Sequence, residues 1–112
     1  MLTQTMKSTM FNVAKSFSRF PGGRRKDHGQ FSGEEFRNKV TIPLLDSYDH
    51  VTFDLSGTVG YSSGFLDEAF GEIGKILGIS EAKRRVTILA QDDPEAVETV
   101  WLRISEASAE SR

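Results

Sequence analysis

The chain has 112 residues, a formal net charge of −2 at pH 7 and no cysteine, and its length suits one domain with a single hydrophobic core. The small net charge provides no general attraction to nucleic acid or to an anionic membrane, and without cysteine there are no disulfides, thiolate catalysis or zinc–thiolate sites. No apolar run approaches the roughly 20 residues that span a bilayer, and no secretory signal is recognisable, so we expect a cytoplasmic protein.

The first predicted strand covers residues 10–17, where apolar residues favour one side of a period-two pattern. It follows residues 1–9, a mostly polar segment that we expect to be flexible. The next stretch, FSRFPGGRRKDHGQ, is rich in glycine and charge, and Pro21-Gly22-Gly23 predicts a turn within this loop.

Residues 32–46 carry the clearest helix signal. Ser32 at the N-cap and Glu35 three residues later match a capping box. Pro43 cannot donate a backbone hydrogen bond and disfavours helical geometry at Ile42, so we expect a kink or break there.

A strand and a second helix follow. Residues 50–55 alternate β-branched and aromatic residues with polar ones, which predicts the strand. A wide apolar face opposite charged residues predicts a helix over residues 63–77. We expect Gly71 and Gly74 to permit close approach of a neighbouring backbone and Gly78 to end the helix.

Residues 85–90, RVTILA, are nearly all apolar, as is typical of a strand covered on both faces. Asp93 and Pro94 suit the N-cap and first position of a last helix. We expect a single domain over residues 10–107 and a flexible C-terminus over residues 108–112. The alternation of strand and helix predicts an α/β domain with a largely parallel sheet.

Two serines, Ser62 and Ser63, stand where the 63–77 helix begins. A helix N-terminus collects unpaired backbone N–H groups and the positive end of the helix dipole. A hydroxyl there either caps the helix or carries a phosphate that the helix end would stabilise, and both interpretations stay open. Asp54, at the end of the preceding strand, either caps its own turn or presents a charge to a partner.

The remaining polar residues offer little catalytic chemistry. Arg24, Arg25 and Lys26 form a basic cluster that is either solvated surface or an anion site. His28 and His50 lack the close spacing of metal ligands. The YSSG segment is not a nucleophile elbow, and no base and orienting acid accompany it, so we predict no enzyme, metal or cofactor.

The segment DLSGTVGYSSGFL, residues 54–66, resembles the signature of STAS domains, the fold of sulfate transporter tails and anti-sigma factor antagonists. The wider pattern is more similar to bacterial STAS-like domains of unknown function. The matching segments occur in the expected order: PGGR (21–24), GQFSGEEFR (29–37), IPLL (42–45), FDLSG (53–57) and SSGFLDEAFG (62–71). The resemblance implies an α/β fold with a mixed, mostly parallel sheet and helices packed on one side.

In the antagonists, the resemblance implies partner switching. An anti-sigma factor with a histidine-kinase-type ATPase fold phosphorylates the matching serine, here Ser62, and the phosphate releases the bound factor. The antagonists carry an aspartate directly before that serine, where this chain has Tyr61. We therefore hypothesise a non-enzymatic bacterial regulatory domain that binds a protein partner of this ATPase kind, with Ser62 or Ser63 as the phosphorylation candidate.

Further residues complete the hypothesis. The candidate partner contacts are Asp54, Tyr61, Asp67 and Glu68. The alternative is a small-molecule or nucleotide sensor, in which Arg24 and Arg25 of the glycine-rich loop bind an anion near the strand ends.

Overall fold

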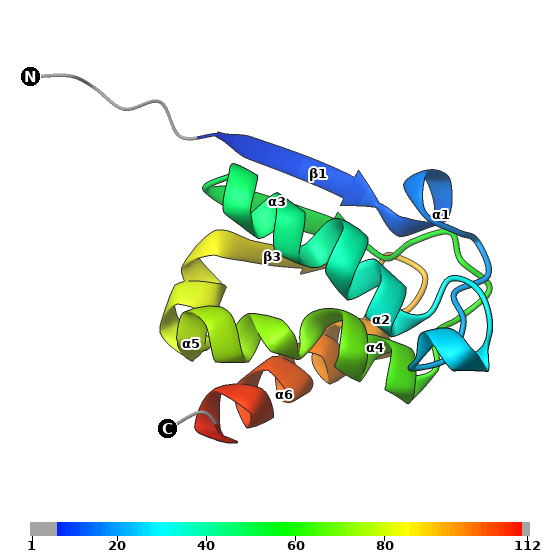
Figure 1. Cartoon of the computed structure of the whole chain (residues 1–112). Helices are drawn as coiled ribbons and strands as arrows, with labels where there is room; N and C mark the ends of the chain where they lie inside the picture. The colour runs from blue at the N-terminus through cyan, green and yellow to red at the C-terminus, as the bar shows by residue number, and fades with distance from the viewer. Residues whose placement is uncertain (1–6, 111–112) are drawn as a thin grey trace, which may run out of the picture.

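The computed structural model describes residues 7–110, and Figure 1 shows helices packed against a small sheet. The sheet has three strands in the order β1 (Ser8–Asn12), β2 (His50–Asp54) and β3 (Val86–Leu89), and both pairs are parallel. The predicted α/β fold with a largely parallel sheet is confirmed. The expectation of a flexible N-terminus lies partly outside the described residues, and Ser8 already belongs to β1.

The described part of the chain also contains eight helical segments. They are α1 (Val13–Ser16), the 3-10 turn η1 (Lys26–His28), α2 (Gly33–Phe36), the π turn η2 (Arg37–Thr41), α3 (Ile42–Ser47), α4 (Ser63–Phe70), α5 (Glu72–Arg85) and α6 (Pro94–Glu110). In Figure 1 the α2–α3 run and the α4–α5 run lie side by side, and α6 packs beyond α4 and α5. None of the helices between residues 7 and 110 is long and apolar enough to cross a membrane.

The first strand was predicted wrongly at both ends. It begins at Ser8, and after Asn12 the chain turns into α1 instead of continuing as a strand to residue 17. The cause is local, because the side chain of Asn12 accepts a hydrogen bond from the Lys15 amide at 2.8 Å and caps α1.

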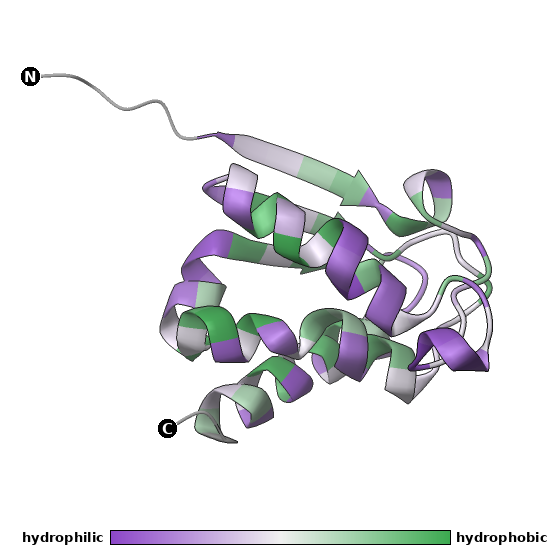
Figure 2. Cartoon of the chain, in the orientation of Figure 1, coloured by the Kyte–Doolittle hydropathy of each residue, from purple (hydrophilic) through white to green (hydrophobic). Residues whose placement is uncertain are grey.

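The helices cover one face of the sheet. Val51 and Phe53 of β2 and Val86 and Ile88 of β3 are buried on that face. On the other face Leu89 is 41% exposed. The prediction that residues 85–90 are covered on both faces is therefore wrong, because none of the helices in residues 7–110 packs on the second face. Hydrophobic and hydrophilic bands alternate along the helices (Figure 2), as expected for helices with only one face on a core.

Phe36 is the centre of an aromatic core. Its side chain is fully buried, and its ring centroid lies 5.0 to 6.1 Å from those of five other phenylalanines: Phe11, Phe17, Phe53, Phe65 and Phe70. These rings come from β1, from the central strand β2, from the segment after α1, and from α4. Tilted and edge-to-face pairs stabilise beyond simple area burial, so one side chain joins α2 to the sheet and to α4.

The helical run from residue 33 to residue 47 begins as predicted but does not break at Pro43. Ser32 caps α2, since its Oγ accepts from the Glu35 amide at 3.1 Å. The backbone widens into η2, in which the Ile42 amide donates to the Arg37 carbonyl, and Pro43 falls in the first turn of α3. A wider turn gives the proline ring room beside the preceding carbonyls, so the chain stays helical.

Gly74 confirms the expected close approach of two backbones. A Cβ added there would lie 2.0 Å from the Ile104 carbonyl oxygen of α6. The predicted end of the helix at Gly78 is confirmed by its φ of 76°, although a further helical segment continues to Arg85.

Helix α6 also extends further than expected. Ser108 is buried, and its Oγ accepts from the Ile79 amide at 3.0 Å. The predicted flexible C-terminus over residues 108–112 thus starts inside a packed helix, whereas residues 111–112 lie outside the described part.

Replacing Gly74 with alanine is expected to destabilise the domain by about 3 kcal/mol, because the methyl group would force α5 and α6 apart. This cost exceeds the gain of about 1 kcal/mol in helix propensity. Urea unfolding of Gly74→Ala measures it, with the exposed neighbour substitution Lys75→Ala as the control. Equal stability of the two variants would contradict the close packing.

Candidate functional site

Ser62 and Ser63 lie exposed at the start of α4. Ser62 is the N-cap: its Oγ accepts from the Phe65 amide at 3.0 Å and donates to the Gly22 carbonyl at 3.3 Å. The Ser63 hydroxyl makes no hydrogen bond with another described residue. Capping by Ser62 is thus confirmed, and both hydroxyls remain within reach of another molecule.

Two loops meet beside these serines. The Val59 amide donates to the Arg19 carbonyl at 2.9 Å, and the Ser62–Gly22 hydrogen bond joins the same two loops further along. This arrangement brings Phe20 and Val59, which are 65% and 67% exposed, to neighbouring positions. We call these two side chains the apolar pair. The apolar pair could not be predicted from periodicity, because neither residue belongs to a periodic pattern. The sequence indicated only that each glycine-rich loop contains an apolar residue.

Arg24 is paired inside the molecule. Its Nη1 lies 2.5 Å from Asp67 Oδ2 and 3.5 Å from Glu68 Oε1, and Arg37 pairs with the other oxygen of Glu68. The hydrogen bond to Asp67 raises the pKa of Arg24 above its ordinary value. The structure therefore joins residues that the sequence analysis assigned to separate roles, the anion candidate Arg24 and the partner contacts Asp67 and Glu68. Arg25 is exposed and has no side-chain partner among the described residues.

Glycines allow this close arrangement. A Cβ added at Gly33 would lie 2.6 Å from the Phe65 carbonyl oxygen, so the first turn of α2 touches the first turn of α4. A Cβ added at Gly64 would lie 3.3 Å from Cβ and 3.5 Å from Nε of Arg24. The Arg24 side chain consequently lies along the first turn of α4, with Gly64 beneath it and Asp67 at its end.

Asp54 caps its own turn. Its Oδ1 accepts from the Ser56 amide at 3.0 Å. Partial burial raises the pKa of Asp54, but hydrogen bonds from Ser56 and Asn12 outweigh it, and the pKa lies below the ordinary value of 3.8. No interaction joins Asp54 to Ser62 in the described structure. Instead, Asp54 lines a separate cavity of about 480 Å³ beside β3 and the start of α6.

Tyr61 points inward. Its hydroxyl donates to the Leu55 carbonyl at 2.8 Å, and its ring lies 5.7 Å from that of Phe65. Burial raises the pKa of Tyr61 to about 12. The hydroxyl of this candidate contact is thus engaged in holding the loop before α4.

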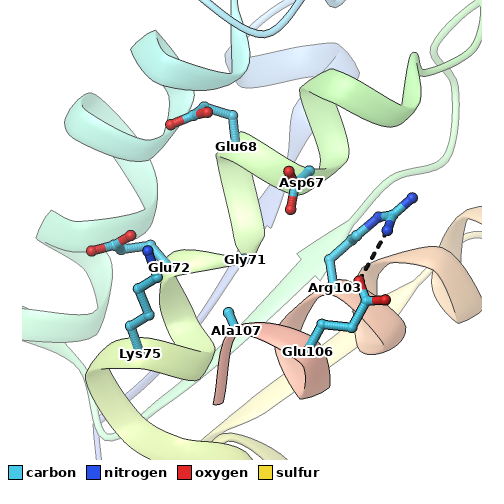
Figure 3. Close-up of a pocket in the computed structure, with 8 residues that line it drawn as sticks. All are labelled: Asp67, Glu68, Gly71, Glu72, Lys75, Arg103, Glu106 and Ala107. Atoms are coloured by element: carbon cyan, nitrogen blue, oxygen red, sulfur yellow. Dashed lines mark hydrogen bonds and ion pairs between the residues drawn. The ribbon is translucent and has the colours of Figure 1, made fainter. Parts of the chain in front are cut away.

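A polar cavity of about 330 Å³ opens between the α4–α5 run and α6 (Figure 3). Its charged residues are four carboxylates and two cations: Asp67, Glu68, Glu72 and Glu106, with Lys75 and Arg103. Arg103 donates to Glu106 at 2.9 Å. Across residues 7–110, no three His, Cys, Asp or Glu side chains gather as metal ligands would.

The sequence profile of one protein family matches the chain. The family is described as STAS-like domain of unknown function (DUF4325), and the match covers residues 32–94, more than half of the chain. It runs from the cap of α2 to the first residue of α6. No curated protein and no solved structure shows significant similarity to the chain.

Ser62→Ala is expected to lower the free energy of unfolding by about 1 kcal/mol, because the Phe65 amide loses its capping acceptor. Ser63→Ala is the matched control and should change stability by less than about 0.5 kcal/mol, since that hydroxyl is exposed and unbonded. Chemical denaturation of both variants checks this difference, and equal losses would argue against Ser62 as the cap.

Tyr61 is expected to ionise at about 12, because its phenol is buried and hydrogen-bonded. Its pKa is raised on folding, so its contribution to stability is full below the ordinary value of 10.0 and is lost as the pH rises towards 12. In Tyr48→Phe, Tyr61 is the remaining tyrosine, and phenolate absorbance against pH measures it directly. A midpoint at the ordinary value would show that the hydroxyl is solvated.

Proposed function

Because the chain belongs to the family of STAS-like domains of unknown function, we propose that it is a bacterial cytoplasmic regulatory domain that binds a protein partner. The binding face consists of Ser62, Ser63 and the apolar pair, and we call it the Ser62 face. The observation that carries the proposal is the exposure of both hydroxyls at the start of α4, together with two exposed apolar side chains on the loops that are hydrogen-bonded to each other next to it.

The apolar pair favours binding of a partner to the Ser62 face. Large apolar side chains that are mostly exposed gain free energy when a partner covers them. Both stand on loops that hydrogen bonds hold to α4, so they are presented on a rigid base. Asp67 and Glu68 are already neutralised by arginines, so they leave little net charge to oppose docking next to the serines.

Phosphorylation of Ser62 is the proposed control. The partner is a kinase-type ATPase whose ATP donates the phosphoryl group: a bond forms from phosphorus to Ser62 Oγ, the bond to ADP breaks, and the hydroxyl proton leaves. The product carries nearly two negative charges at a face whose other contacts are apolar. Burying that charge in the complex is costly, so the partner is released.

The domain supplies no catalysis in this proposal. The hydrogen-bond partners of the Ser62 side chain are the Phe65 amide and the Gly22 carbonyl, neither of which is a general base. The alternative of a nucleotide sensor gains no support from the geometry, because none of the cavities described above is lined by Arg24 or Arg25.

Ser62→Asp is expected to weaken partner recovery from cell extract at least about tenfold, because it places a charge on the Ser62 face. Ser62→Asn is the matched control: asparagine and aspartate both cap helices well, so the two variants differ in charge alone. Equal recovery of the same partners by wild type, Ser62→Asp and Ser62→Asn would contradict the proposal that a negative charge at Ser62 releases the partner.

A second pair of variants tests the surface within the same assay. Phe20→Ala should also lose the partner, whereas Leu102→Ala removes an exposed apolar side chain from α6 and should retain it. Retention by Phe20→Ala would show that the partner binds elsewhere.

A further inference from the structure

Arg24 lies between the carboxylate of Asp67 and the start of α4, where a phosphate on Ser62 would stand. Its guanidinium pairs with Asp67, while its Nε passes beside Gly64, two residues after Ser62. The loop that carries Arg24 is also tied to the serine, because Ser62 Oγ donates to the carbonyl of Gly22, two residues before Arg24. The Arg24–Asp67 pair is about two-fifths exposed on both sides, so water can reach it and the pair can separate without leaving a buried charge.

We propose that Arg24 exchanges its ion-pair partner, leaving Asp67 for a phosphoryl group on Ser62. This inference rests on the proposed function, because it takes Ser62 as the modified residue. The side chain of Arg24, in the loop before α2, responds to the modification. When Ser62 is unmodified, Arg24 holds this loop to Asp67, and when Ser62 is phosphorylated, Arg24 holds the loop to the phosphate.

Charge and shape favour the exchange. A phosphoserine carries nearly two charges and three acceptor oxygens, against one charge and two oxygens on Asp67, and guanidinium binds such groups in a bidentate fork. The backbone of Arg24 need not move, because its carbonyl stays bonded to the Glu34 amide at 2.9 Å and only the side chain turns. Ser62 and Asp67 are five positions apart along α4 and its cap, or about 7.5 Å along the axis, which is within the reach of an arginine side chain.

The exchange has a consequence away from Ser62. Asp67 lines the polar cavity between α4–α5 and α6, on the opposite side from Arg103 (Figure 3). Once Arg24 leaves, Asp67 loses the ion-pair partner that it has in the unmodified protein, while Glu68 keeps its pair with Arg37. Modification of one hydroxyl thereby changes the charge on two surfaces of α4.

The test uses the full chain with phosphoserine installed at position 62 during synthesis, so neither kinase nor partner is needed. Phosphorus NMR measures the second pKa of the phosphate, which is about 6 for an isolated phosphoserine. Arg24→Gln should raise this pKa by about one unit relative to the phosphorylated parent, because a nearby cation favours the dianion. Arg25→Gln is the matched control and should leave the pKa unchanged, since that side chain is exposed and unpaired.

A second measurement leaves the sequence unaltered, in case Arg24→Gln disturbs the loop. The Nε–H signal of Arg24 in nitrogen-15 spectra should shift between the Ser62 and phosphoserine forms, and that of Arg37 should stay. An unmoved Arg24 signal, or the same phosphate pKa in the parent and in Arg24→Gln, overturns the exchange.

Failure here is distinguishable from failure of the proposed function. If Ser62→Asp loses the partner but Arg24 does not respond to phosphoserine, partner switching stands and the exchange falls. If Arg24 responds but the partner binds all Ser62 variants equally, the exchange stands and the switch falls.

Discussion

A clamp of four charged side chains holds the Ser62 face to the rest of the domain: Arg24, Arg37, Asp67 and Glu68. Both carboxylates lie on α4. The guanidinium group of Arg24 comes from the loop before α2, and that of Arg37 comes from η2. The Glu68 side chain is only 12% exposed, so removing its cations would leave a largely desolvated charge. The clamp acts together with the backbone hydrogen bonds of the glycine-rich loop, such as that from the Glu34 amide to the Arg24 carbonyl, to hold this loop over α4.

Packing beneath the clamp makes these distances possible. Gly33 and Gly64 bring the first turn of α2 and the stem of Arg24 against the first turn of α4, where any side chain would intervene. The Phe36 ring then fixes α2 to the sheet and to α4 through its aromatic neighbours. An aromatic centre and a charged rim therefore orient the same pair of helices, and the two serines stand at the edge where both helices begin. This is a rigid base for a surface that changes charge.

Much of the local structure could be predicted from the sequence. The caps at Ser32 and Ser62, the end of a helix at Gly78 and the strand from residue 50 to residue 54 all follow from hydrogen bonds and periodicity within a few residues. Their order was enough to predict a largely parallel α/β fold, because alternation of strand and helix restricts the topology, whereas the family was identified from the resemblance of short sequence segments.

Tertiary packing decided what those local patterns do not contain. Arg24 and Asp67 are 43 residues apart, and only the docking of α2 on α4 makes them partners instead of separate candidates for an anion and a protein contact. The exposure of Leu89 on the second face of the sheet and the hydrogen bond between the loops of Phe20 and Val59 likewise depend on the packing of segments that are distant in the chain. The sequence by itself determined the helix caps, the strand from residue 50 to residue 54 and the position of two hydroxyls at the start of α4, because a few neighbouring residues specify each of these features. Which charges meet, and which apolar side chains stay in water, was decided by contacts between segments far apart in the chain.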